Sequence, residues 1–158
     1  MKGSTLIVLS LLMTGACTNN RLNRESTSDS ISIASDGHLN TSKTLCFIRV
    51  EGNSNQDTSF IKLKINGADV SGEFRHIPYE KDSRLGTIQG KMKGNEIKAL
   101  WSFMQEGMND TLGVELKLGE NQLLQKSYSV DPVRGRQFIS DTSRYTIVYN
   151  NIDCQSFN

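Results

Sequence analysis

From Thr44 onward, apolar and polar residues alternate in short runs that are separated by turn-forming residues. In one run, Ile61, Leu63 and Ile65 occupy every second position and lysines lie between them. This period of two places the apolar side chains on one face of a half-buried β-strand. No segment keeps a helical period. The pattern predicts about eight strands, over residues 46–50, 60–65, 70–79, 86–93, 96–105, 111–118, 122–130 and 145–150.

The links between these runs are short, and most contain glycine. Asn66-Gly67 and Gly94-Asn95 are tight-turn sequences, because both residue types tolerate positive φ. Sequential antiparallel strands with short links form an up-and-down meander, and closing that meander into a barrel removes its open edges. We therefore predict an all-β fold, a closed antiparallel barrel of the lipocalin or calycin type. A β-sandwich is the alternative, but it needs longer crossovers.

The first 16 residues have the pattern of a signal peptide. Lys2 gives a positive start, and the apolar run over residues 6–13 is too short for a stable bilayer span. Gly15, Ala16 and Cys17 resemble the lipobox of bacterial lipoproteins, in which the cysteine receives diacylglycerol and a further acyl chain such as palmitate. Thr14 stands where that motif usually has Leu. The alternative is ordinary secretion with cleavage after Ala16.

Lipidation of Cys17 predicts the location and the domain plan of the mature protein. The acyl chains would anchor it in the cell membrane or the outer membrane, with its domain in the periplasm or at the cell surface. Residues 17–43 are rich in Ser, Thr and Asn and cannot bury enough apolar area to fold, so they form a flexible tether. Residues 44–158 then form the barrel domain.

Two further cysteines flank the predicted meander. Cys46 opens the first strand, and Cys154 lies just beyond the last one. The first and last strands of a closed meander are neighbours, and an exported protein reaches a compartment in which disulfides persist. With Cys17 lipidated, we expect Cys46 and Cys154 to pair. Two unpaired, buried thiols are the alternative.

Charge and residue content narrow the functions to be considered. The formal net charge is +1, and removal of residues 1–16 takes away only Lys2. A nearly neutral domain has no electrostatic attraction for nucleic acid. His38 and His76 are the only histidines, and no cysteine or histidine spacing matches a metal site. We therefore expect no catalytic residues, no metal and no cofactor, and a function that is not enzymatic.

Two connections are the candidate binding loops. Residues 79–84 concentrate charge of both signs, and Glu106 lies in the connection at 106–110. In a meander, alternate connections share one end of the barrel, so these two should lie together there. Solvated turns, in which the carboxylates cap backbone donors, are the alternative. The candidate residues are Tyr79, Glu80, Lys81, Asp82, Arg84 and Glu106.

An ordered series of short motifs between the two cysteines resembles an uncharacterised lipoprotein family of Bacteroidota. The motifs are Asp57-Thr58, Ile61-Lys62-Leu63, Asn66-Gly67, Val70-Ser71-Gly72, Tyr79-Glu80-Lys81-Asp82, Gly86-Thr87-Ile88-Gln89-Gly90, Met92-Lys93-Gly94 and Glu106-Gly107. Two positions depart from the family pattern: Arg84 stands where the family often has Asn, and Leu112-Gly113 stands where an Arg is expected. The resemblance implies a cell-envelope lipoprotein but no particular activity.

These features predict a membrane-anchored, non-enzymatic binding or interaction module whose partner is a protein or a small molecule. One alternative is an inhibitor of a lysozyme-like hydrolase, by analogy with other small, disulfide-closed barrels. Another is a lipocalin-like carrier of a small ligand, in which Trp101 would stack on the ligand. We expect Trp101 instead to fill the barrel interior together with Phe103.

Overall fold

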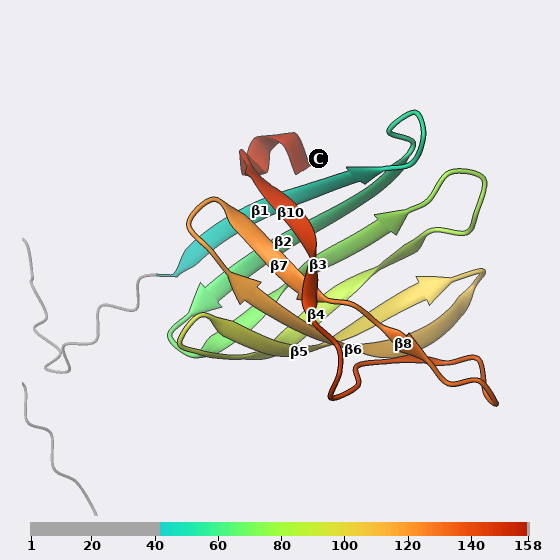
Figure 1. Cartoon of the computed structure of the whole chain (residues 1–158). Coiled ribbons are helices and arrows are strands. Elements are labelled where there is room, and N and C mark those ends of the chain that lie inside the picture. The colour runs from blue at the N-terminus through green and yellow to red at the C-terminus, as the bar shows by residue number, and fades with distance from the viewer. Residues whose placement is uncertain (1–41, 158) are drawn as a thin grey trace, which may run out of the picture. The chain divides into compact units, whose positions relative to one another are not determined.

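Strands make up most of residues 42–157, the part of the chain that the computed structural model describes (Figure 1). The elements are β1 (Lys43–Glu51), β2 (Asp57–Asn66), β3 (Asp69–Ile77), β4 (Arg84–Lys93), β5 (Glu96–Gln105), β6 (Met108–Leu118), β7 (Gln122–Lys126), β8 (Ser129–Val130), β9 (Gln137–Phe138), β10 (Tyr145–Ile152) and the short 3-10 helix η1 (Cys154–Phe157). The predicted signal peptide, Cys17 and nearly all of the predicted tether lie outside the described residues.

Eight of these strands form the closed antiparallel barrel that the sequence predicts. Neighbouring strands follow the order β1-β10-β7-β6-β5-β4-β3-β2, and β1 pairs with both β10 and β2 (Figure 1). Closure leaves no barrel strand at the edge of the sheet. The β-sandwich alternative is therefore wrong. The remaining strands, β8 and β9, form a separate two-stranded ribbon.

The register of β1 to β5 arranges the inward side chains in layers. One layer contains Phe47, Ile61, Phe74, Gly86 and Phe103, which lie opposite one another in successive strands. Its four apolar side chains are buried. Full burial of an apolar side chain of this size contributes roughly 1.5–3 kcal/mol. This apolar layer is therefore one of the stabilising parts of a core that contains fifteen buried residues in the described part of the chain.

Aromatic rings join this layer to the next one. The ring centroids of Phe74 and Trp101 are 4.1 Å apart, and those of Trp101 and Phe103 are 4.4 Å apart. The indole Nε1 of Trp101 donates a hydrogen bond to the carbonyl oxygen of Phe74 at 3.1 Å. Trp101 is 2% exposed. It is therefore a core residue, as predicted, and its ring does not offer a surface to a ligand.

Gly86 allows β4 and β5 to come close together inside the barrel. A Cβ atom at this position would lie 1.9 Å from the carbonyl oxygen of Ser102 and 2.5 Å from the Cα of Phe103. Both contacts are with backbone, which cannot rotate away as a flexible side chain would. A side chain at position 86 would therefore force the two strands apart.

The predicted strand over residues 122–130 is wrong in its second half. β7 ends at Lys126, and β8 pairs with β9 and not with a barrel strand. β6 pairs with β7 over Leu116–Leu118 only. The chain that follows β7 therefore has no pairing with β6 that would continue the strand. The backbone N–H of Ser127 donates instead to the carbonyl oxygen of Arg144 at 2.9 Å. The connection from β7 to β10 thus leaves the barrel wall.

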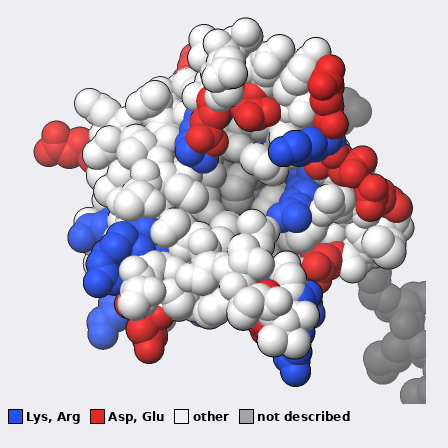
Figure 2. Space-filling model, turned by 45° about the vertical axis from the view of Figure 1, so that its right-hand side comes forward, with Lys and Arg blue, Asp and Glu red and all other residues white. Residues whose placement is uncertain are grey.

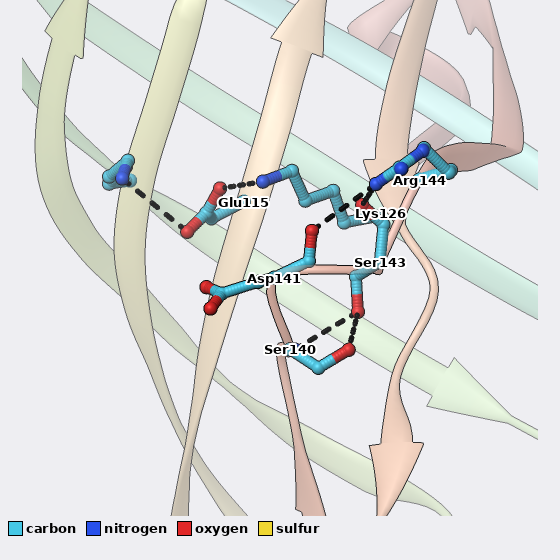
Figure 3. A network of polar contacts seen from close by, with 7 residues as sticks. Glu115, Lys126, Ser140, Asp141, Ser143 and Arg144 are labelled. Atoms are coloured by element: carbon cyan, nitrogen blue, oxygen red, sulfur yellow. Dashed lines mark hydrogen bonds and ion pairs between the residues drawn. The ribbon is translucent and has the colours of Figure 1, made fainter.

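Polar contacts join β5, β6 and β7 next to the point where this connection begins. Glu115 on β6 pairs with Lys126 on β7 at 2.6 Å and with Lys98 on β5 at 3.6 Å (Figure 3). The hydrogen bond from Lys126 holds the pKa of Glu115 below its usual value. Within the connection, the backbone N–H of Ser140 donates to the hydroxyl of Ser143 at 3.1 Å. Glu115 therefore ties three strands together beside the departing chain.

The predicted disulfide between Cys46 and Cys154 is confirmed. It joins β1 to η1, which directly follows β10, with the two Cα atoms 5.1 Å apart. The bond spans 108 residues of sequence. For a loop of this length, the chain-entropy model gives a stabilisation of about 4–5 kcal/mol. The bridge thus reinforces the pairing that closes the barrel.

The close approach at Gly86 predicts a specific loss of stability. Gly86→Ala should lower the free energy of unfolding by about 1–3 kcal/mol, because the added methyl group overpacks against backbone. Gly113→Ala is the matched control, since a Cβ there meets no atom within 4 Å. That substitution should be neutral or raise stability by up to about 1 kcal/mol. Urea unfolding of both variants checks the prediction, and equal effects would contradict it.

Candidate functional site: the polar mouth of the barrel

The candidate site lies at one open end of the barrel, which we call the mouth. The connections 51–57, 77–84, 105–108 and 126–145 gather there, whereas Lys43 at the start of β1 lies at the opposite end. Figure 2 shows a hollow with acidic and basic side chains along part of its rim. The cavity has a volume of about 530 Å³. Its lining residues are Glu51, Gly52, Asp57, His76, Pro78, Lys81, Asp82, Arg84, Gln105 and Gln137.

The two predicted binding loops meet at the mouth. Lys81, Asp82 and Arg84 line the cavity. Glu106 lies at the tip of the turn between β5 and β6, with a φ of 50°. A hydrogen bond with Asp82 raises the pKa of Glu106, which places the two loops in contact.

Tyr79 and Glu80, the other two predicted loop residues, do not line the cavity. The backbone N–H of Tyr79 donates to Oδ1 of Asp57 at 2.7 Å, while its side chain is 51% exposed. Glu80 has a φ of 53° and is exposed. Both residues are thus exposed parts of the connection, and the carboxylate that caps the backbone of Tyr79 belongs to β2 and not to the loop itself.

One layer of inward side chains forms the floor of the mouth, and we call it the polar belt. It consists of Arg49, Ser59, His76 and Arg84, opposite one another in β1 to β4, together with Gln105 of β5. The belt lies two residues along each strand from the apolar layer that contains Phe103. The barrel interior therefore changes from apolar to polar within one step of the strand period.

Arg84 is held in the belt from three directions. Its Nε donates to Oε1 of Gln105 at 2.7 Å, and its Nη1 donates to Oε1 of Gln137 at 2.8 Å. The guanidinium carbon lies 5.2 Å from the ring centroid of Phe103, within the range of a cation–π interaction. Gln137 belongs to β9, so the connection that leaves the wall reaches back over the mouth.

The carboxylates near the floor already have partners. Glu51 is paired with Arg49, which is two residues away on the same strand. Asp57 lies opposite Glu51 in β2 and accepts the hydrogen bond from the backbone of Tyr79. Arg84, in contrast, takes part in no ion pair within residues 42–157.

His76 and Ser59 form a hydrogen-bonded pair, with Nδ1 and Oγ 2.8 Å apart. Burial and, to a lesser degree, the charge of Arg84 hold the pKa of His76 below 6.5. Ser59 is only 3% exposed, so its hydroxyl is poorly placed to attack a substrate. No carboxylate accepts a hydrogen bond from His76 in the described part of the chain. The pair is therefore suited to polar binding and lacks the orienting acid of a triad.

Of the ten residues that line the cavity, only Lys81, Asp82 and Arg84 are among the candidates predicted from the sequence. Glu51, Asp57 and Gln137 lie in or beside connections that, like 77–84 and 105–108, are at the mouth end of a meander. The rule that alternate connections share one end of the barrel placed the two charged loops together. The same rule would have located these residues as well. Ser59 and Gln105 had a weaker signal, a polar residue at an inward position near a strand end.

Three further findings concern metal binding, membrane-spanning helices and similarity to known proteins. Within residues 42–157, no three His, Cys, Asp or Glu side chains are grouped so that they could hold a metal ion. None of the helical segments in the same residues is long and apolar enough to cross a membrane. Comparisons with family models, curated proteins and solved structures give no match to this chain. The resemblance to a Bacteroidota lipoprotein family therefore stays a prediction.

The environment of His76 predicts its titration and its effect on stability. Since its pKa in the folded protein lies below 6.5, the unfolded chain binds the proton first as the pH falls. The free energy of unfolding should therefore rise with pH up to about 6.5 and then level off for this group. His76→Gln should flatten that rise in urea unfolding.

The same titration tests the proximity of Arg84. Arg84→Gln removes a positive charge that disfavours protonation, so the pKa of His76 should increase. Glu51 and Asp57 act in the opposite direction, and Arg49 acts in the same direction as Arg84. NMR of the imidazole protons measures the shift, with His76→Gln to assign the signal. A pKa of His76 that does not move in Arg84→Gln would contradict this geometry.

Proposed function

We propose that this protein is a lipid-anchored binding module of the cell envelope that holds a small polar ligand, or a polar group of a larger partner, in the mouth. The observation that carries this proposal is the cavity over the polar belt. Ligand sites are typically concave, have volumes of roughly 300–1,000 Å³ and are lined mainly by apolar residues with a few fixed polar groups. The mouth has the shape and volume of such a site, but its lining is mainly polar and charged, which suits a polar ligand.

The filling of the rest of the barrel supports a site at the mouth. The interior beyond the apolar layer is occupied by buried side chains of the protein itself. A lipocalin-like carrier of a large apolar ligand would need that space. A lipocalin-like carrier therefore fits this barrel only if its ligand is small and polar. Such a ligand would lie above Phe103 and in contact with Arg84.

The position of the predicted anchor is compatible with an open mouth. The predicted tether joins the barrel at Lys43, at the end opposite the mouth. Lipidation of Cys17 would hold the protein at the cell membrane or outer membrane. The tether would then be attached to the end of the barrel that does not carry the binding site. The inhibitor of a lysozyme-like hydrolase stays a prediction that a peptidoglycan turbidity assay would test.

A fragment screen tests the binding site. Isotope-labelled protein with Cys17→Ala should bind some of a library of neutral, cationic and anionic compounds, with NMR shifts at His76, Arg84 and Gln105. Gln105→Trp fills the mouth and should abolish these shifts. Val133→Trp is the matched control, because Val133 is 90% exposed and does not line the cavity. Shifts that map elsewhere, or that survive Gln105→Trp, would contradict the proposal.

The anchor is tested separately. Mass spectrometry of the mature protein from membranes should show a chain that begins at Cys17 and carries diacylglycerol and an acyl group. Cys17→Ala should move the protein from the membrane fraction to the soluble fraction. An unmodified Cys17 in the mature chain would refute the lipoprotein assignment while leaving the mouth proposal intact.

A further inference from the structure

The ligand's chemistry can be inferred from Arg84, if the proposed binding at the mouth holds. Two of the belt residues are arginines, and they differ in their partners. Arg49 is neutralised by Glu51. Among residues 42–157, Arg84 contacts neutral groups, the amide oxygens of Gln105 and Gln137 and the ring of Phe103, and forms no ion pair. The mouth therefore contains one guanidinium whose charge no carboxylate compensates.

This guanidinium is also held in position. Gln105 and Gln137 use Nε and Nη1, which leaves Nη2 and one proton of Nη1 without a partner among the described side chains. A guanidinium presents its donors in a planar fork that matches the two oxygens of a carboxylate or of a phosphate. Since Arg84 is already held in position, little additional side-chain entropy is lost on binding.

The rim of the mouth distinguishes between these two anions. Asp82 lines the cavity. Glu106 interacts with Asp82, and this interaction raises the pKa of Glu106. With Glu51 and Asp57, the lining has three carboxyl groups against two cationic side chains, Lys81 and Arg84. The carboxyl groups repel an incoming anion, and the repulsion grows with its charge. A singly charged carboxylate is therefore accepted more readily than a doubly charged phosphate.

We propose that the mouth binds small organic molecules through a single carboxylate, which pairs with the guanidinium of Arg84. The remainder of the ligand occupies the cavity beside His76 and Lys81. The carboxylate would also lie near the imidazole of His76, because the two belt residues are opposite each other in β3 and β4. Carboxylate binding should therefore raise the pKa of His76, which gives a second measurement independent of affinity.

Matched acids and amides test this proposal on the Cys17→Ala chain. The probes are N-acetylalanine and benzoate, their primary amides, and phenyl phosphate. NMR follows the Nε–Hε signal of Arg84, assigned by its absence in Arg84→Gln, and the imidazole signals of His76, which also report on binding to the Arg84 variants. The acids should bind at least about tenfold more tightly than their amides, as expected for a charge-assisted hydrogen bond. Benzoate should also bind more tightly than phenyl phosphate.

Two variants separate a specific role from a general loss of charge. Arg84→Gln should remove the preference for acids, so that each acid and its amide bind with similar affinity. An unchanged indole signal of the buried Trp101 shows that the core of the barrel is intact in this variant. Arg134→Gln removes the same charge from an exposed residue that does not line the cavity, and it should retain the preference. Arg84→Lys should keep only part of it, because an ammonium lacks the planar fork.

The outcomes distinguish this inference from the function on which it rests. If acids and amides bind the mouth equally, or if the preference survives Arg84→Gln, the carboxylate inference is wrong and the binding site stands. Tighter binding of phenyl phosphate than of benzoate would also refute it, in favour of a phosphate ligand. If no probe and no library compound shifts a mouth signal, both proposals fail.

Discussion

The closure of the barrel between its first and last strands is the constraint on which the rest of the structure depends. β1 pairs with β10 over Cys46–Ile48, a short ladder, and the disulfide from Cys46 to Cys154 reinforces it. Closure gives the sheet an inside, so every second residue of each strand points to a shared interior. Residues from β1 to β5 can then form complete layers, and the polar belt exists only because those layers are in register.

The two interior layers depend on each other. Phe103 is buried in the apolar layer, where its ring is tilted against that of Trp101, and it also lies beneath the guanidinium of Arg84. The packing that stabilises the core thus fixes the position of the charge at the mouth. Gly86 contributes by allowing β4 and β5 to approach each other next to Phe103. The geometry of the site is therefore a consequence of core packing as much as of the connections.

The fold could be predicted from the sequence because its signals are local. The period of two in strands such as 60–65, the tight turns and the two flanking cysteines are sufficient for a closed meander. The site could be predicted only in part, because it depends on register. That Arg49, Ser59, His76 and Arg84 form one belt follows from strand pairings that no short motif specifies. The alternation of residues 70–79 puts His76 on the same face as Phe74. The alternation of connections places the loop of Asp82 beside that of Glu106.

The break in the wall after Lys126 shows why the wrong part of the prediction matters. A continuous strand over 122–130 would have extended β7 along β6 and made a more regular barrel. Instead, the chain leaves the barrel wall at Ser127, whose backbone N–H donates to Arg144. β9 then places Gln137 next to the guanidinium of Arg84. The most irregular segment of the described domain therefore supplies one of the two amides that hold the one uncompensated charge of the belt. Regular pairing was replaced by a polar contact at the same end of the barrel as the cavity.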